Sequence, residues 1–321
     1  MGNTVLVVDN VDADNTLAAV AACNPMLGID LKAVIVTGRF AHDDPTADIT
    51  AWSPAYSEEV RRRNARRLKG VLTRMGYDVP VFEGLIPPRT LVPHGVHIDE
   101  QLLDFFWDDK FVATDGSFQA ALAFIASLRG SIDLIVGGPL TEVAAMLGDS
   151  RLAGKFRKLT AQMGMFGFGE VETMAGGRRS FNSGCDPDAV RKVIELFPGE
   201  VYFVSTDTTK LEEVGFDHPS DLEKAGVPAE LVMLTAAFWS HALRARGERI
   251  YPHDVHPVLL LSQLNKMGYT PIYGVRSVTF THVDDDGVIT VNDAQESRHY
   301  LVRSVDAYRF KMLLGGALRP M

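Results

Sequence analysis

Residues 4–15 read Thr-Val-Leu-Val-Val-Asp-Asn-Val-Asp-Ala-Asp-Asn, an apolar run followed at once by carboxylates and carboxamides. The apolar half, residues 4–8, is typical of a strand that is buried on both faces. In parallel α/β sheets, ligands bind in the loops at the carboxyl ends of the strands, and residues 9–15 form such a loop. This stretch therefore predicts a buried parallel strand that ends at a polar site.

Strand and helix patterns alternate through the rest of the chain. Further strands are predicted at 32–37, 79–82, 132–136, 201–204 and 300–302, and helices at 17–22, 57–75, 118–128, 140–147, 228–246, 256–267 and 305–314, with one more beginning at 186–187. Such alternation indicates a mostly parallel open sheet flanked by helices, with right-handed crossovers. The run Asp284-Asp285-Asp286-Gly287 between two β-rich segments predicts a C-terminal β-hairpin.

The composition is that of a globular protein with an acidic balance. The 321 residues are 46% hydrophobic and 23% charged, and 32 Lys and Arg against 41 Asp and Glu give a formal charge of −9. This excess of acidic residues argues against a protein that binds the phosphate backbone of nucleic acids. Length alone allows two domains, but the candidate residues below all serve one pocket, so we expect a single domain over residues 1–321.

The sequence also bears on the cellular compartment. Cys23 and Cys185 make no disulfide framework, which favours a reducing environment. The first ten residues lack the basic and apolar regions of a signal peptide. Since no apolar run approaches the roughly 18 residues of a membrane span, we expect a soluble, cytoplasmic protein that does not bind membranes.

The loop at residues 9–15 is the first of four candidate sites. It holds three carboxylates and two carboxamides, which suit a hard cation such as Ca²⁺ or the hydroxyls of a sugar. Asx-rich loops are also common as turns and helix caps, and Asp14 or Asn15 is placed to cap the first helix.

Each of the other three candidate sites also has both a functional and a purely structural explanation when it is taken alone. His253-Asp254 supplies a proton donor and an anionic ligand at a helix start, or only a capping Asp beside an incidental His. Residues 137–142 form a glycine turn between a strand and a helix, without the Gly-Lys-Ser/Thr of a phosphate-binding Walker loop. Residues 180–189 form either a polar site segment or a capped surface loop.

Together these segments resemble the inosine–uridine-type nucleoside hydrolase family, and the resemblance spans nearly the whole chain. That family has an Asp-x-Asp-Pro-Gly-x-Asp-Asp-Ala loop after its first strand, then Gly-Pro-Leu-Thr-Asn, Glu-Phe-Asn and Asp-Pro-x-Ala segments, and a late His-Asp pair. The counterparts are residues 10–17, 138–142, 180–182, 186–189 and 253–254, and residues 78–84 and 94–95 match further family segments. The order of these segments predicts the family's single-domain α/β fold.

The resemblance implies hydrolysis of the N-glycosidic bond of a ribonucleoside or a related ribosyl compound. In that family, Ca²⁺ and an Asp activate the water that attacks the anomeric carbon, through an oxocarbenium-like transition state. A late His protonates the departing base. The implied partner is therefore a small molecule, and the family suggests a homodimer or homotetramer.

The same resemblance assigns roles to individual positions. Catalytic roles fall to Asp14 and His253. The implied Ca²⁺ ligands are Asn10, Asp14, Asn15, the backbone carbonyl of Gly137, and Asp254. The implied substrate contacts are Asp14, Arg39, His94, Ser180, Asn182 and Asp254.

Several positions depart from the family's pattern. Asn10 stands where the presumed general base, an Asp, is expected, and Asn15 replaces the last Asp of the loop. A carboxamide keeps an oxygen for coordination but accepts no proton at neutral pH, and losing two negative charges weakens Ca²⁺ binding. Asp9 and Asp12 supply replacement carboxylates if this loop folds differently from the family's loop. Ser180 replaces the Glu of Glu-Phe-Asn.

Arg39 replaces an Asn that follows the glycine of the second strand, and three roles remain open for it. Its guanidinium binds a phosphate or carboxylate on the ligand, pairs with the acidic loop in place of a cation, or faces solvent. Phe238, Trp239 and His241 either line the base site or belong to the core.

Three functions remain open. The first is an N-glycosyl hydrolase with altered active-site residues, which the retained Asp14 and His253-Asp254 favour. The second is a ribosyl- or nucleoside-binding protein that has lost its metal, which the missing general base favours. The third is an altered ribosyl-transfer enzyme.

Overall fold

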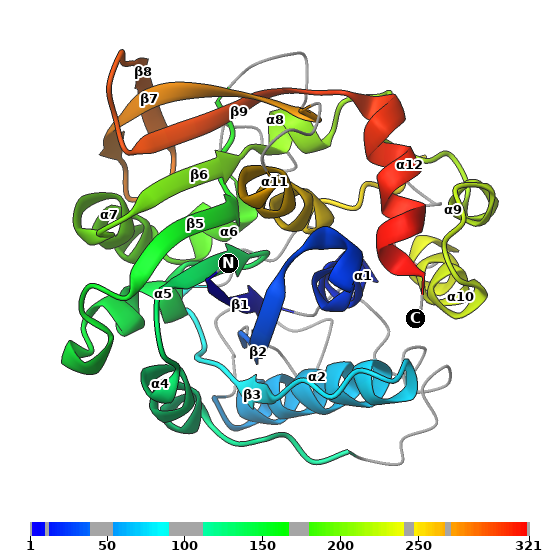
Figure 1. Ribbon diagram of the computed structural model, residues 1–321, viewed down its shortest axis with the longest axis horizontal. Coiled ribbons are helices and arrows are strands. Elements are labelled where there is room, and N and C mark those ends of the chain that lie inside the picture. Colours follow the sequence, from blue (N-terminus) through cyan, green and yellow to red (C-terminus); the bar gives the residue numbers. More distant parts are fainter. Residues whose placement is uncertain are drawn as a thin grey trace.

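The computed structural model describes residues 2–9, 13–38, 54–89, 112–166, 180–240, 247–266 and 271–319, with residues 54–56 described by their backbone only. A nine-stranded sheet runs through them (Figure 1). In spatial order the strands are β3 (Val81–Glu83), β2 (Asp30–Val36), β1 (Asn3–Val8), β4 (Ile132–Val136), β5 (Phe156–Gln162), β6 (Glu200–Val204), β9 (His299–Val305), β7 (Tyr273–Val283) and β8 (Ile289–Asp293).

The sheet is mostly parallel, as predicted. All neighbours from β3 to β9 pair in parallel, and β7 and β8 are antiparallel at one edge. The predicted hairpin is β7–β8, and its turn includes Gly287 at a φ of +80°, a left-handed conformation that glycine adopts without strain. The predicted fold class, an α/β open sheet with a C-terminal hairpin, is confirmed. The bounds 1–321 of the domain stay a prediction.

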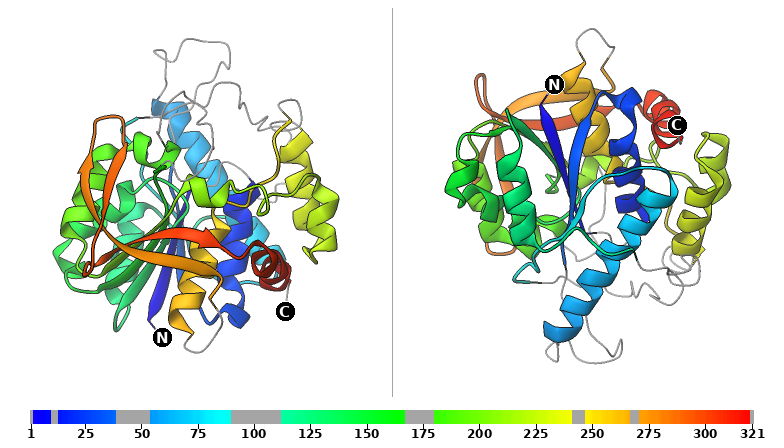
Figure 2. Two further views of the ribbon diagram at one scale, coloured as in Figure 1. Left: turned by 90° about the horizontal axis from the view of Figure 1, so that it is seen from above. Right: turned by 60° about the horizontal axis from the view of Figure 1, so that its bottom comes forward.

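Helices cover both faces of the sheet (Figures 1 and 2). The described helices are α1 (Ala13–Cys23), α2 (Pro54–Arg74), α4 (Phe118–Ser127), α5 (Thr141–Leu147), α6 (Phe181–Cys185), α7 (Pro187–Leu196), α8 (Thr206–Thr209), α9 (Pro219–Lys224), α10 (Ala229–Phe238), α11 (Val255–Asn265) and α12 (Ala307–Leu318). One face packs against α1, α2, α11 and α12, and the other against α4, α5 and α7.

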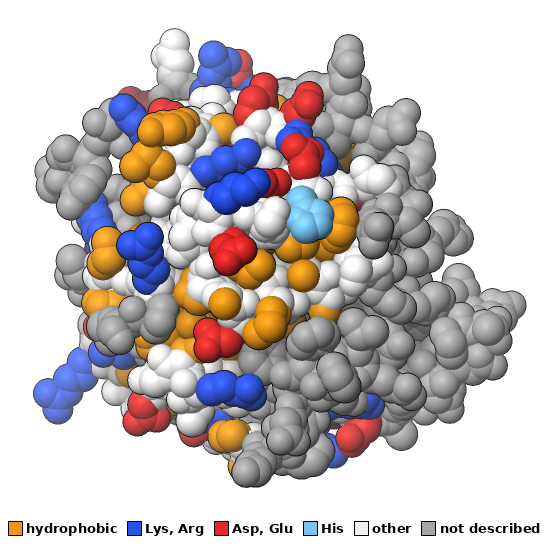
Figure 3. Space-filling view, turned by 90° about the vertical axis from the view of Figure 1, so that its right-hand side faces the viewer, with side chains coloured by type: hydrophobic (Ala, Val, Ile, Leu, Met, Phe, Trp, Pro, Cys, Tyr) orange, Lys and Arg blue, Asp and Glu red, His pale blue; other side chains and the backbone are white. Residues whose placement is uncertain are grey.

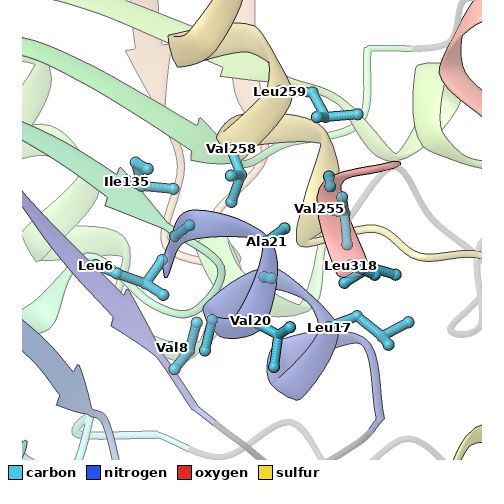
Figure 4. Close-up of a cluster of buried hydrophobic side chains, with 14 of the residues drawn as sticks. Leu6, Val8, Leu17, Val20, Ala21, Ile135, Val255, Val258, Leu259 and Leu318 are labelled. Atoms are coloured by element: carbon cyan, nitrogen blue, oxygen red, sulfur yellow. The ribbon is translucent and has the colours of Figure 1, made fainter. Parts of the chain in front are cut away.

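Strand β1 shows why both faces are covered. Val5 and Val7 join the hydrophobic cluster of α4, α5 and α7, whereas Leu6 and Val8 join the cluster of α1 and α11. All four side chains are fully buried. In Figure 4, Leu6 and Val8 lie against side chains of α1, and Val258 of α11 lies on the far side of α1 near Ile135 of β4. This packing brings the first turn of α11 to the carboxyl ends of β1 and β4.

Strand β5 was not predicted from the sequence. Its sequence, Phe-Arg-Lys-Leu-Thr-Ala-Gln, places two charged residues in a strand that lies between β4 and β6. Arg157 forms an ion pair with Asp133 of β4, and Lys158 donates to the side-chain oxygen of Asn265 at 3.2 Å. Because the charged side chains find partners beyond the strand, the strand tolerates a pattern that argues against it.

Several helix ends also differ from prediction. Asp14 and Asn15 do not cap the first helix, because α1 begins at Ala13 and both residues lie in its first turn. Helix α12 begins at Ala307 because Val305 completes β9. Asp186 caps α7 by accepting the backbone N–H of Ala189, with Pro187 in the first turn as predicted.

The surface over α9, α10 and α12 carries mixed side chains. Basic, acidic and apolar groups are interspersed among the described residues of this side (Figure 3). The exposed apolar side chains of α12 include Tyr308 and Met312. Among the helices that the structure describes, none is long and apolar enough to cross a membrane.

Candidate active site

The candidate site lies at the carboxyl end of the sheet, around the tip of β1. Asp9, directly after β1, is 5% exposed, and the turn after β4 lies against it. A Cβ on Gly138 would lie 3.2 Å from the backbone nitrogen of Asp9, so only a glycine fits there without movement. The predicted polar loop thus meets the predicted glycine turn.

Three predicted residues from distant parts of the chain meet in this region. Asn15 is 1% exposed, and its Nδ2 donates to Oδ2 of Asp254 and lies 3.4 Å from the backbone oxygen of Gly137. A Cβ on Gly137 would lie 2.7 Å from Cγ of Asp254, which shows how closely the carboxylate packs on the turn. Residues 15, 137 and 254 therefore form one buried cluster.

Asp14 contacts the same cluster from the edge. Its Oδ2 accepts the backbone N–H of Asp254 at 3.3 Å, and its side chain is only partly buried. A carboxylate in this position can bind ligand hydroxyls or accept a proton. Asp14 is thus suited to the catalytic role that the resemblance implies.

His253 lies next to Asp254 and is held by a residue that the sequence did not single out. Its Nδ1 is 2.6 Å from the hydroxyl oxygen of Thr209, at the end of α8. Burial, and then the positive charge of Lys210 and an electrostatic effect of His256, lower the pKa of His253 well below 6.5. The ring is therefore neutral at pH 7, and the proton sits on one of its two nitrogens.

Asn182 belongs to a chain of buried amides and hydroxyls. Its Nδ2 donates to Oε1 of Gln162 at 2.8 Å and to the backbone oxygen of Gln162 at 3.0 Å. Gln162 in turn donates from Nε2 to the hydroxyl of Thr206 at 3.2 Å. The hydroxyl oxygen of Thr209 lies 3.3 Å from the backbone oxygen of Thr206 and 2.6 Å from Nδ1 of His253, so the chain of polar groups leads from Asn182 toward His253.

Sequence reasoning missed Gln162 and Thr209 for different reasons. Gln162 ends the strand that was not predicted. Thr209 closes the polar run 205–209 directly after the predicted strand 201–204, at the carboxyl end of the sheet. The rule that ligands bind at these ends would have indicated Thr209, but not Gln162.

Glu142 is a second buried carboxyl group beside the site. It is fully buried, and its Oε1 accepts the backbone N–H of Leu85 at 2.7 Å. Burial raises the pKa of Glu142 to about 7; the Leu85 N–H opposes the rise, and the charge of Asp186 adds to it. The Thr37 hydroxyl opposes the rise as well. The family motif given above carries Asn at this position, where this chain has Glu142.

The remaining predicted residues divide into two groups. Ser180 is buried at the start of α6, and its backbone oxygen accepts the N–H of Gly184 at 3.0 Å. Asn10, Arg39 and His94 lie outside the described residues, as do Asp12 and His241. The roles of Asn10, Arg39 and His94 therefore stay predictions.

Two aromatic residues can be placed. Phe238 and Trp239 are partly buried and pack against the core that includes α1 and α11. The Trp239 indole donates to the backbone oxygen of Glu248 at 3.2 Å. Their contacts agree with the core alternative.

The described residues fit a calcium ion poorly. No group of three or more His, Cys, Asp or Glu side chains that could hold a metal occurs among them. Ca²⁺ is bound by six to eight oxygens at about 2.3–2.6 Å. Here the amino group of Asn15, a hydrogen-bond donor, faces both Asp254 and Gly137. Two oxygens that a cation would use, Oδ2 of Asp254 and the backbone oxygen of Gly137, therefore face this donor instead.

Comparison with known proteins places the chain in a family. A sequence model of the inosine-uridine preferring nucleoside hydrolases matches residues 30–312. The chain belongs to this family. The match begins beyond residues 9–15, the loop in which Asn10 and Asn15 depart from the family's pattern. The recognition made from the sequence is confirmed, and the family indicates a nucleoside hydrolase in general.

Solved nucleoside hydrolases share the fold. The inosine-uridine preferring enzyme from Bacillus anthracis has 15% identity and a TM-score of 0.70, with 100% of each chain covered. A plant nucleoside hydrolase has 18% identity and a TM-score of 0.68, with 98% of each chain covered. The purine-preferring ribonucleoside hydrolase from Gardnerella vaginalis has 16% identity and a TM-score of 0.70, covering 98% of this chain and 99% of the other. Among curated proteins, none matches this chain.

Proposed function

We propose that this chain hydrolyses the N-glycosidic bond of a ribonucleoside or a related ribosyl compound. The observation that carries the proposal is the contact between Asp14 and the backbone of Asp254, with His253 as the next residue. A partly exposed carboxylate thus contacts the backbone of the residue that follows a neutral histidine, at the edge of the sheet where α/β proteins bind ligands. Membership of the nucleoside hydrolase family supports the same chemistry.

The proposed reaction assigns one task to each group. Water attacks the anomeric carbon, and Asp14 accepts a proton from it. The bond between the anomeric carbon and the base nitrogen breaks, and its electron pair leaves with the base. The hydrogens of water end on the new sugar hydroxyl and on the base nitrogen, toward which His253 donates a hydrogen bond. Buried Asp254 stabilises the positive charge that develops on the sugar.

Substrate binding involves the other predicted residues. Asn182 is proposed to bind a sugar hydroxyl, since Gln162 holds its amide in one orientation. Arg39, His94 and Ser180 are proposed as further substrate contacts on the strength of the resemblance. Ca²⁺ is the cofactor that the resemblance implies, and when bound it would polarise the attacking water.

Substrate screening tests the proposal. Nucleosides, nucleoside 5′-phosphates and ADP-ribose compounds are incubated with the protein, and released base and reducing sugar are measured. We expect release from at least one class, and a loss of about 10²-fold or more for Asp14→Ala and Asp254→Ala. Asp188→Ala on α7, where the side chain is 87% exposed, is the matched control and keeps full turnover. Full turnover by either site variant would refute the assignment.

A nucleoside-binding protein without turnover is the second candidate. The contact between Asn15 and Asp254 favours it, because it engages a carboxylate that a catalytic metal would need. Calorimetric binding of a nucleoside, without release of base, would decide for this candidate. The cytoplasmic location and the homodimer or homotetramer stay predictions, and light scattering measures the oligomeric state.

A further inference from the structure

The Asn15 side chain lies between two groups that can only accept hydrogen bonds. Its Nδ2 donates to the carboxylate of Asp254 and lies 3.4 Å from the carbonyl oxygen of Gly137. A carbonyl oxygen and an ionised carboxylate only accept hydrogen bonds, and it is the amino group of the amide, not its oxygen, that faces them. The bond to Asp254 is charge-assisted and buried, with the two residues 1% and 5% exposed.

A cation at this position would require the opposite arrangement. Ca²⁺ binds oxygens, so the amide of Asn15 would have to turn over and lose both donations. Turning it over without a cation would place three oxygens of Asn15, Gly137 and Asp254 against one another. Asp254 packs so closely on Gly137 that a Cβ on Gly137 would lie 2.7 Å from Cγ of Asp254. This packing places the Asp254 carboxylate and the Gly137 carbonyl next to the same donor, the amino group of Asn15.

We propose that the amide of Asn15 takes the place of the divalent cation in this pocket. It holds Asp254 to the turn after β4, so the pocket forms without a metal ion. An Asp at position 15, which the family's motif carries, would place two carboxylates face to face and would need a cation between them. The inference concerns the pocket of the proposed function, but its test measures stability and metal binding rather than turnover.

Thermal unfolding with Ca²⁺ or with EDTA tests the inference. The midpoint of the wild-type protein is expected to be the same in both. Asn15→Asp is expected to lower the midpoint in EDTA by on the order of 5 °C, because a buried charge then lacks a partner. Ca²⁺ is expected to restore the midpoint of this variant by binding only its folded state.

The double variant Asn15→Asp with Asp254→Asn exchanges the amide and the carboxylate between the two positions. It tests whether the pocket needs the pair of groups or an amide at position 15 in particular. The amide and the carboxylate are both present again, so the midpoint in EDTA is expected to recover without Ca²⁺. Asn24→Asp is the matched control, since Asn24 is 2% exposed and donates to the carbonyl oxygens of Gly316 and Ala317. It is expected to lower the midpoint, and Ca²⁺ is expected not to restore it.

The inference has clear contrary outcomes. Stoichiometric calcium in the purified wild-type protein would overturn it, and so would a wild-type midpoint that rises with Ca²⁺ and falls with EDTA. An Asn15→Asp variant that folds and ignores Ca²⁺ would also count against it. If that variant does not fold, the wild-type protein and the exchanged pair decide. Absence of turnover with every substrate, beside a calcium-independent midpoint, would reject the proposed function and leave this inference standing.

Discussion

The hydroxyl oxygen of Thr209 lies 2.6 Å from Nδ1 of His253 and 3.3 Å from the backbone oxygen of Thr206. A hydroxyl carries one proton, and the shorter contact is the stronger bond. When Thr209 donates to Nδ1, the proton of the neutral ring must sit on Nε2. In that tautomer the other ring nitrogen of His253, Nε2, can donate to a leaving group.

Replacing Thr209 with Val is expected to lower kcat on nucleosides by about 10-fold or more, since the ring loses its partner. A riboside with a nitrophenolate leaving group departs without a proton donor, so its kcat is expected to change little. Steady-state kinetics on both substrates measure the difference. Nitrogen chemical shifts of the labelled His253 ring report the tautomer without any turnover.

Two variants control this experiment. Thr209→Ser keeps the hydroxyl and is expected to restore both the kinetics and the ring shifts. Thr208→Val removes a neighbouring buried hydroxyl that donates to the backbone oxygen of Val302 at 3.0 Å, so it is expected to affect stability alone. Equal losses on the two substrates for Thr209→Val would argue that Thr209 acts through folding and not through His253.

Glu142 is expected to make stability depend on pH. Its pKa is raised from 4.5 to about 7 in the folded protein, so between these values the folded state binds more protons than the unfolded state. The free energy of unfolding therefore falls as the pH rises from about 4.5 to about 7, by ~3 kcal/mol, and stays lowered above that range. Glu142→Gln, which has no charge to bury, is expected to lack this loss.

Urea denaturation of both proteins at pH 5 and pH 8 measures the effect. The stability difference between wild type and variant is expected to shift in favour of Glu142→Gln at pH 8. Glu223→Gln, at an exposed position in α9, is the surface control and is expected to follow the wild type at both pH values. Parallel pH profiles for wild type and Glu142→Gln would contradict the assignment.

The turn after β4 is expected to tolerate no side chain. In Gly137→Ala the new Cβ would lie 2.7 Å from Cγ and 2.9 Å from Oδ1 of Asp254, which forces that carboxylate to move. A displacement of this kind is expected to reduce nucleoside hydrolysis by on the order of 100-fold. Gly70→Ala in α2 meets no atom within 4 Å and is expected to keep activity while gaining up to ~1 kcal/mol of stability. Assays of turnover and melting temperature on both variants check the contrast, which unimpaired Gly137→Ala would refute.

The ion pair between Arg157 and Asp133 is expected to respond differently to loss of each partner. Asp133 is fully buried, whereas the Arg157 side chain is 40% exposed. Arg157→Met leaves a buried carboxylate without its partner and is expected to cost ~3 kcal/mol. Asp133→Asn leaves a cation that water can reach, so it is expected to cost ~1 kcal/mol. Urea denaturation of both variants measures this, and a larger loss for Asp133→Asn would contradict the expected order.

Much of the fold could be predicted because β1 and its neighbours are uniformly apolar. Val5 to Val8 are buried on both faces of the sheet. An uninterrupted apolar run of this kind is typical of a parallel strand that helices cover on both sides. Strand β5 could not be predicted, because Arg157 and Lys158 are compatible with a strand only through partners on β4 and α11. Those partners are distant in the chain, and no local pattern reveals them.

The sequence predicted which residues form the candidate site better than it predicted how their side chains interact. Asp14, Gly137 and Asp254 follow from motif positions, and the structure brings them together. At position 15 the sequence indicated a weakened oxygen ligand, whereas the structure turns the nitrogen of that amide to Asp254. Which end of an amide faces a neighbour depends on that neighbour, so a sequence pattern does not contain it.

The order of strands in the sheet has a consequence for how the protein is made. Strand β1 pairs with β4, which follows it by more than a hundred residues, and Asp254 contacts Asn15 although 239 residues separate them in the sequence. Strand β9 then inserts between β6 and β7. Contacts this distant in sequence form slowly and cannot form on a partly synthesised chain. The growing polypeptide must therefore extend past Asp254 and α11 before the Asn15–Asp254 contact can form, and translation products interrupted earlier would carry exposed strand edges without the assembled candidate site.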